Sequence, residues 1–420
     1  MQTAEEFEKL NVEVIEKIES GLRQQDDASL NIIIQALQKA ASLAISNCTG
    51  THLPNLDRIL AKTANIIRGQ QRQRQSSSGK TIILVSELYT NGGHTRITED
   101  IVNLVPGEVL IVITDYTGNY ANGKLALSEL YERFRGVSVL TLPAGTHIAK
   151  VLSLTNVINL VSPDKLYLLL HHDDSIGYVA AFAHNVSGLK SFFIHHADHN
   201  PTLGATLRYE KHLDTTKEYS QKCKELNCYN CDTLPLYVKD KGAKTANLAN
   251  GFVNFASVGS HNKFTFEGSL DHATRIINCL KFDTSRFFHI GPLSENSLKK
   301  INTALSENGM KSERFKHIHH VPSVWQAFLE LDVHALIGAA PLGGGRTAIE
   351  AQGAGVPVLW YHDKTVKSMY EAQDLSWDDQ NSLDIAILKV MKNYFEYSKN
   401  ARKFYEKFYN EDLFKKSLGF

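Results

Sequence analysis

The stretch PLGGGRTAIEAQGAGVPV, residues 341–358, runs from the end of a predicted strand through three glycines into a helix and then into another strand. The glycines leave backbone N–H groups open to an anion at the start of the helix, where the helix dipole also favours negative charge. Two side chains follow in the first helical turn, and an acid one turn later can accept hydrogen bonds from ribose hydroxyls. The stretch therefore predicts a nucleotide site, and its candidate residues are Gly343, Gly344, Gly345, Arg346, Thr347 and Glu350. The alternative is an ordinary strand, loop and helix that ends at Gly353 or Gly355.

Outward from this stretch, short apolar runs alternate with helical patterns in both directions. The strand candidates are TIILVSEL, VLIVITDY, VSVLTLP, KLYLLLHH and SFFIHH in the first half, and GFVNFASVG, RFFHIGPL, FKHIHHV, HALIGA and VPVLWYH in the second. Such alternation predicts parallel sheets with helices on both faces. The polar, cysteine-containing residues 204–233 interrupt the alternation. We therefore predict an α/β chain with two Rossmann-like domains.

Changes in composition place the domain boundaries. Residues 1–68 carry three amphipathic helical patterns, whereas residues 69–80, GQQRQRQSSSGK, have no apolar residue and predict an exposed linker. The predicted parts are an N-terminal helical region at 1–68, the linker at 69–80, a first Rossmann-like domain at 81–235, a second at 236–395, and a C-terminal helix at 396–420 that packs back across the domains. We expect the N-terminal helices either to cover the first domain or to form a homodimer.

The overall composition excludes several classes of protein. Lys plus Arg and Asp plus Glu both number 45, so no net charge draws the chain to nucleic acid. No apolar run approaches the roughly 20 residues of a membrane-spanning helix. The initial MQTAEEFEKL lacks the basic and apolar regions of a secretory signal, and five cysteines are no disulfide framework. We expect a cytoplasmic protein with no nucleic-acid partner and no transmembrane segment.

In the first half, NGGHTR at residues 91–96 follows the first strand and opens a helix. Gly92 and Gly93 let the backbone approach a ligand closely, and the helix N-terminus favours an anion. The pattern is not the GxGxxG of dinucleotide sites, and a plain turn with a capping Thr95 is the alternative. His94 lies beside the glycines and is a candidate base.

Imidazoles and carboxylates end two further strands of the first half. The two clusters are His171, His172, Asp173 and Asp174, and then His195, His196, Asp198 and His199. A general base with an orienting partner needs such groups together, and so does a metal site. We select His196 and His94 as candidate bases and Asp198 as the orienting group. Polar residues that line a cleft edge without chemistry are the alternative.

Three cysteines lie in the polar segment, at Cys223, Cys228 and Cys231. A structural zinc site normally has four ligands, and His212 is the nearest candidate for the fourth. Reduced thiols in a loop are the other interpretation, and we expect no stoichiometric metal.

In the second half, SVGSHNK at residues 257–263 follows the strand that opens the domain. A lysine just past a strand end can meet a diphosphate as a point charge. Ser260, Asn262 and Lys263 are therefore further candidate contacts for the nucleotide.

Together these motifs resemble the GT-B glycosyltransferases, in which two Rossmann-like domains face each other across a cleft. The local likeness is to the O-GlcNAc transferase and bacterial protein N-glucosyltransferase group, and it extends over residues 80–400. In that group a loop with an Asn and a diphosphate-binding Lys opens the second domain, as Asn262 and Lys263 do here. Its later Gly-rich loop carries consecutive hydroxyl residues and an acid for the ribose, at the places of Arg346, Thr347 and Glu350.

The sequence also departs from that group. Arg346 replaces one of the paired hydroxyl residues, and the tetratricopeptide repeats of the O-GlcNAc transferases are missing. Many retaining GT-B enzymes carry a second Glu eight positions before the ribose acid, where this chain has Leu342. That difference favours an inverting reaction.

The resemblance implies a glycosyltransferase that moves a sugar from a nucleotide sugar, most simply a UDP-sugar, to an acceptor hydroxyl with inversion and without a metal. The acceptor is a glycan, a polysaccharide or a protein, and no further cofactor is expected. Three alternatives stay open: a CMP-linked donor, a sugar-nucleotide epimerase, and a non-catalytic GT-B module that binds a partner.

Overall fold

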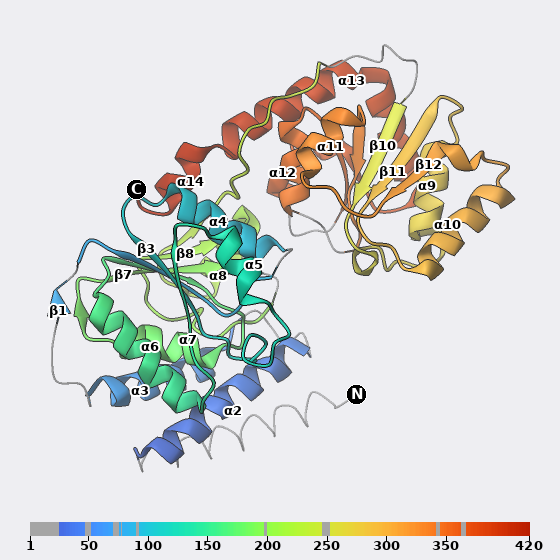
Figure 1. Ribbon diagram of the computed structural model, residues 1–420. Helices are drawn as coiled ribbons and strands as arrows, with labels where there is room; N and C mark the ends of the chain where they lie inside the picture. The colour runs from blue at the N-terminus through green and yellow to red at the C-terminus, as the bar shows by residue number, and fades with distance from the viewer. Residues whose placement is uncertain are drawn as a thin grey trace. The chain divides into compact units, whose positions relative to one another are not determined.

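The computed structural model describes residues 25–46, 52–69, 75–76, 78–89, 92–196, 200–245, 253–341, 345–362 and 367–420. Two compact units make up the chain, and each is drawn in Figure 1. Unit 1 extends to Leu234 and takes back the last six residues, Lys415–Phe420, whereas unit 2 is Pro235–Phe414. The first predicted helical pattern, at residues 7–22, lies outside the described residues.

Unit 1 is built on a seven-stranded parallel sheet with the order β4-β3-β2-β5-β7-β8-β9. The strands are β2 (Thr81–Val85), β3 (Val109–Ile113), β4 (Ser138–Thr141), β5 (Lys165–Leu169), β7 (Lys190–His195), β8 (Lys211–Asp214) and β9 (Cys231–Thr233). The central strand β2 is buried along its whole length, as expected when helices cover both faces. A separate two-residue pair joins β1 (Gln75–Ser76) to β6 (Val186–Ser187).

Helices cover both faces of this sheet (Figure 1). Those of the unit are α4 (Gly93–Leu104), α5 (Leu127–Arg133), α6 (His147–Val161), α7 (Ser175–Ala183) and α8 (Lys217–Glu225). The segment 204–233, predicted as a polar interruption, instead contains β8, α8 and β9 and extends the sheet by two strands. The prediction was wrong because these strands are only three or four residues long, too short to show a clear hydrophobic period.

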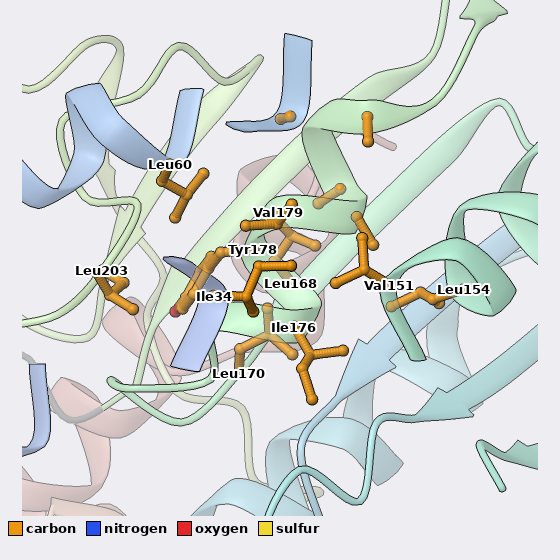
Figure 2. Packing of buried hydrophobic residues seen from close by; sticks show 14 of the residues in the cluster. Ile34, Leu60, Val151, Leu154, Leu168, Leu170, Ile176, Tyr178, Val179 and Leu203 are labelled. Carbon is orange, nitrogen blue, oxygen red and sulfur yellow. The ribbon is translucent and has the colours of Figure 1, made fainter. Parts of the chain in front are cut away.

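Two N-terminal helices, α2 (Asp27–Ser46) and α3 (Pro54–Gly69), add a further layer outside α6 and α7. Figure 2 shows Ile34 of α2 and Leu60 of α3 among the apolar side chains of α6 and α7. The Asp57 carboxylate also ties α3 to the loop before β8, because it accepts hydrogen bonds from the Gly204 and Thr206 N–H groups at 2.6 and 2.9 Å. The two helices therefore belong to the core of unit 1.

Helix α2 is long and apolar enough to pass a length-and-hydropathy test for a membrane span. No apolar run of that kind was expected from the sequence. Eight residues of α2 are buried in unit 1, however, and Ser175 at the start of α7 donates a hydrogen bond to the Ile34 carbonyl at 2.8 Å. The apolar face of α2 is thus occupied by the protein itself.

Unit 2 is built on a six-stranded parallel sheet with the order β12-β11-β10-β13-β14-β15. Its strands are β10 (Val253–Val258), β11 (Ser285–Ile290), β12 (Phe315–Ile318), β13 (Ala335–Ile337), β14 (Val358–Tyr361) and β15 (Ser376–Trp377). Its helices are α9 (His272–Leu280), α10 (Glu295–Glu307), α11 (Val324–Glu330), α12 (Gly345–Gly353) and α13 (Gln380–Phe408), followed by α14 (Glu411–Ser417). The predicted α/β class with two parallel-sheet domains is confirmed.

The C-terminal helical region begins earlier than the predicted residue 396. The Asp379 carboxylate caps α13 by accepting the Ser382 N–H at 2.7 Å, and the helix then continues for 29 residues with a kink at Asn393. The last residues pack on unit 1, where Tyr167 donates a hydrogen bond to the Leu418 carbonyl at 2.8 Å.

The packing of α2 gives a stability prediction. Ile34→Ala should lower the free energy of unfolding by about 2 to 5 kcal/mol, because a fully buried side chain leaves a cavity. Ile32→Ala is the matched control on the same helix, since Ile32 is 65% exposed and its loss should cost less than about 0.5 kcal/mol. Urea unfolding followed by circular dichroism measures both variants. Equal effects would mean that α2 does not pack on unit 1 in solution.

Candidate functional site

Each sheet has a point at which the strand order reverses, and ligands of such sheets bind beyond the carboxyl ends of the strands at this point. In unit 1 the order reverses between β2 and β5, and in unit 2 between β10 and β13. The loops that follow these four strands contain most of the site residues predicted from the sequence.

His94 connects the segment after β2 to the end of β5 at the reversal point of unit 1. Helix α4 begins at Gly93, and its N-cap Gly92 has a φ of 151°, a conformation that side-chain-bearing residues rarely adopt. This turn places His94 so that its Nε2–H donates a hydrogen bond to the carbonyl of Leu169, the last residue of β5, at 2.6 Å. The ring is therefore fixed in one tautomer, and its other nitrogen, Nδ1, is buried.

Four imidazoles gather at this edge of the sheet, and we call them the imidazole cluster: His94, His171, His172 and His196. The ring centroids of His94 and His196 are 4.6 Å apart, and the ring of His172 stacks on that of His196 at 5.6 Å. Burial, with the neighbouring His171, lowers the pKa of His94 to about 4. Burial and the surrounding imidazoles hold the pKa of His196 well below its ordinary value. His94 and His196 are thus neutral at pH 7.

The carboxylates next to the cluster are engaged in the fold. Asp174 caps α7 through the Gly177 N–H and also accepts hydrogen bonds from Ser86 and Thr114, both at 2.6 Å. Asp173 accepts hydrogen bonds from Tyr116 at 2.8 Å and from Ser42 of α2. Through these contacts both carboxylates hold neighbouring segments of unit 1 in place.

Sequence reasoning missed two residues directly after β2, Ser86 and Glu87. Both side chains are buried, and Glu87 accepts hydrogen bonds from Tyr89, Thr117 and Asn119. Tyr89 in turn stacks on His171 of the imidazole cluster, with 6.0 Å between ring centroids. The signal for these residues was a polar pair at the end of a fully apolar strand.

The pair His195 and His196, predicted as one cluster, divides at the end of β7. His196 joins the imidazole cluster, whereas the Nδ1 of His195 lies 3.0 Å from the Asp214 carboxylate at the end of β8. Successive side chains of a strand point to opposite faces, which accounts for the division. Asp198 and His199 lie outside the described residues, so the orienting role of Asp198 stays a prediction.

In unit 2 the loop after β10 is held by a close backbone contact. A Cβ atom on Gly291 would lie 2.3 Å from the Gly259 carbonyl oxygen, so only glycine fits there. His289 also lies on this contact, with its Nε2 3.1 Å from the same oxygen. The loop then places Ser260 before the short helix His261–Lys263, and burial lowers the pKa of Lys263.

The glycine-rich stretch follows β13 on the other side of the reversal point. Helix α12 begins at Gly345, with Arg346 and Thr347 partly exposed in its first turn and Glu350 one turn further on. A Cβ on Gly345 would lie 2.7 Å from Met369 Cε, so the helix start packs tightly. Gly343 and Gly344 lie outside the described residues. Because β10 and β13 are neighbouring parallel strands, Lys263 and the α12 N-terminus lie at the same edge of the sheet.

No protein-family model and no curated protein sequence matches this chain. Its fold is similar to that of Anabaena HepE in complex with UDP, with a TM-score of 0.62 and 10% identity over 80% of this chain and 98% of that one. The lipopolysaccharide outer core galactosyltransferase WaaB matches with a TM-score of 0.56 and 14% identity, covering 80% of this chain and 97% of that one. A Thermobaculum terrenum O-GlcNAc transferase mutant matches with a TM-score of 0.53 and 14% sequence identity. This match covers 97% of this chain and 80% of that one. The chain has the predicted GT-B fold.

The neutral His94 gives a prediction about stability and pH. In the unfolded chain a histidine has a pKa of about 6.5, so the unfolded state binds a proton before the folded state does. The contribution of His94 is therefore complete above pH 6.5 and is lost as the pH falls toward about 4. In His94→Gln the loss of unfolding free energy between pH 7 and 4 should be smaller by on the order of 1 to 3 kcal/mol. Urea unfolding at several pH values tests this, and parallel curves for the two proteins would contradict it.

Proposed function

We propose that this protein is a glycosyltransferase that moves a sugar from a UDP-linked donor to an acceptor hydroxyl, with inversion. One observation carries the proposal: Lys263 and the N-terminus of α12 follow the two neighbouring strands at the reversal point of unit 2. A cation and a helix N-terminus at one edge suit a diphosphate. The similar structure of HepE holds UDP in one complex and UDP-glucose in another.

The donor would be held by groups from two loops. Lys263 and Arg346 supply positive charge to the diphosphate, and Ser260, Asn262 and Thr347 supply hydrogen-bond donors next to them. Glu350 lies one helical turn beyond Arg346, where its carboxylate can accept the ribose hydroxyls. In the same scheme the glycines Gly92 and Gly93 at the start of α4 give the donor or acceptor close access to unit 1.

The base we propose is His196 rather than His94. The Nε2–H of His94 is committed to the Leu169 carbonyl and its Nδ1 is buried, so neither nitrogen faces an acceptor. His196 is partly exposed and neutral, as a proton acceptor must be. It would take the proton from the acceptor hydroxyl while that oxygen attacks C1 of the sugar. The bond from C1 to the diphosphate breaks, and the nucleoside diphosphate leaves with its charge stabilised by Lys263 and Arg346.

The proposed reaction accepts any acceptor that offers a hydroxyl group. A glycan, a polysaccharide or a protein side chain each offers a hydroxyl, and the chemistry above is the same for all three. The scheme places the positive charge for the leaving group on protein cations and backbone N–H groups, and so uses no metal at the diphosphate.

Calorimetry with UDP tests the donor site. Lys263→Ala should weaken UDP binding by about 1 to 3 kcal/mol, since a charge-assisted hydrogen bond is lost. Lys281→Ala is the control, because Lys281 is a surface lysine of unit 2 that pairs with Asp384 at 3.0 Å. CMP measured alongside should bind more weakly than UDP. An unchanged affinity in folded Lys263→Ala would remove Lys263 from the donor site, and stronger binding of CMP would favour the other donor class.

Kinetics test the base. His196→Ala should lower kcat by roughly 10² to 10⁴ while the UDP affinity changes little, as expected when a general base is removed. The matched control is His184→Gln, at the end of α7 remote from the imidazole cluster. In the unaltered protein the acid limb of kcat/KM should fall below pH 6.5, because the base has a lowered pKa. Normal turnover in His196→Ala would exclude the assignment, and a retained anomeric configuration in the product would exclude inversion.

A further inference from the structure

A second cluster of reactive side chains lies in unit 1, and the proposed function does not use it. It consists of His212 on β8, Cys223 on α8, Cys228 just after α8 and Cys231 at the start of β9. His212, Cys223 and Cys228 are buried, and Cys231 is partly buried. Imidazole and thiolate are the ligands that zinc prefers in structural sites.

Three of the four ligand atoms lie close enough to share one ion, and the fourth lies beside them. Those of His212, Cys228 and Cys231 all lie within 4.8 Å of one another. Cys223 Sγ lies within the same distance of Cys228 Sγ and of a His212 ring nitrogen. In a tetrahedral zinc site with Zn–S bonds of about 2.3 Å, neighbouring sulfurs are roughly 3.8 Å apart. His212, Cys228 and Cys231 are therefore already placed to share one ion, and Cys223 Sγ would have to move toward it to complete the set.

His212 is oriented as a ligand. Its Nδ1–H donates a hydrogen bond to the Ala205 carbonyl at 3.2 Å, so Nε2 is the ring nitrogen that would meet a metal once its proton is released. That Nε2 is buried, makes no hydrogen bond within the described part of the chain, and faces the Asp214 carboxylate at 3.5 Å. Metal-binding histidines typically donate their other ring N–H to a carbonyl or carboxylate in this way.

The backbone around the cysteines is shaped to bring them together. Asn227 and Asn230 have φ values of 61° and 50°, the left-handed conformation that asparagine tolerates in tight turns. Cys228 N–H donates to the Cys223 carbonyl at 3.0 Å, and His212 N–H donates to the Asn230 carbonyl at 3.1 Å. Two consecutive turns thus bring Cys228 and Cys231 back beside Cys223 and His212.

We propose that His212, Cys223, Cys228 and Cys231 bind one structural zinc ion. Binding would release the thiol protons, so that three thiolates and a neutral imidazole surround the cation. We leave Asp214 outside the proposed ligand set because three sulfurs and one imidazole complete it, and the Asp214 Oδ1 accepts from His195 Nδ1 at 3.0 Å. Four protein ligands leave no open position for a substrate, which makes the site structural.

The proposed zinc site has a consequence for the imidazole cluster. It would join β8, α8 and β9, the last elements at this edge of the sheet, and Asp214 would connect it to His195 at the end of β7. His196, the next residue, is the proposed base. The metal would therefore fix the strand end on which the base lies, although zinc binding itself does not depend on the proposed function.

Elemental analysis of the full-length protein, purified without chelator, tests the site directly. In contrast to the expectation from the sequence alone, we expect one zinc per chain in the unaltered protein and its loss in Cys228→Ser. Cys279→Ser is the matched control, because Cys279 is a buried cysteine of α9 in unit 2 and should leave the zinc content unchanged. Asp214→Asn should also keep the metal, whereas its loss there would move the carboxylate into the ligand set and contradict the proposed one.

Cobalt gives a second measurement that needs no variant. The unaltered protein loaded with Co²⁺ should show the visible bands of a tetrahedral site and near-ultraviolet charge transfer from three thiolates. A protein that carries no stoichiometric zinc, takes up none on dialysis against Zn²⁺ and gives only an octahedral cobalt spectrum would overturn the proposal. UDP calorimetry on the same sample reports on unit 2 separately, so failure of one proposal is distinguishable from failure of the other.

Discussion

The candidate site of unit 1 depends on a buried carboxylate that joins three strand ends. Asp174 follows β5, accepts hydrogen bonds from Ser86 after β2 and Thr114 after β3, and caps α7. Burial raises the pKa of this group, and its hydrogen bonds compensate for part of the desolvation. A carboxylate in this position can be tolerated only if all its partners are present. Asp174 therefore fixes the starts of the loops that carry the imidazole cluster.

In unit 2, backbone contacts rather than a buried carboxylate fix the loops that follow the strands. Gly259 and Gly291 touch after β10 and β11, and His289, itself 2.8 Å from Ser257 Oγ, lies against the Gly259 carbonyl. An anion site benefits from this arrangement, because a buried carboxylate beside Lys263 would compete with a diphosphate for its charge. The difference between the two units thus matches the roles proposed for them, proton transfer in one and anion binding in the other.

Much of this architecture could be predicted from the sequence. Apolar runs as long as TIILV and KLYLL predict buried parallel strands, which the structure contains as β2 and β5. His94, His196 and Lys263 follow strands of the two sheets, as the sequence predicts, whereas their roles stay predictions. Two features could not be predicted. Strands of three or four residues such as β8 and β9 have no visible period, and the separation of His195 from His196 requires knowing which face of β7 each side chain occupies.

Because His195 and His196 lie on opposite faces of β7, the two side chains at this one strand end have different surroundings. A polar strand terminus in a parallel sheet lies between two helix layers, so adjacent side chains enter different environments. His196 meets other imidazoles and loses basicity through desolvation and their mutual repulsion, which keeps it neutral. His195 meets the Asp214 carboxylate next to the cysteines, where an imidazole orients an anion. A single pair of adjacent histidines therefore connects the proposed base, His196, to the cluster proposed to bind zinc.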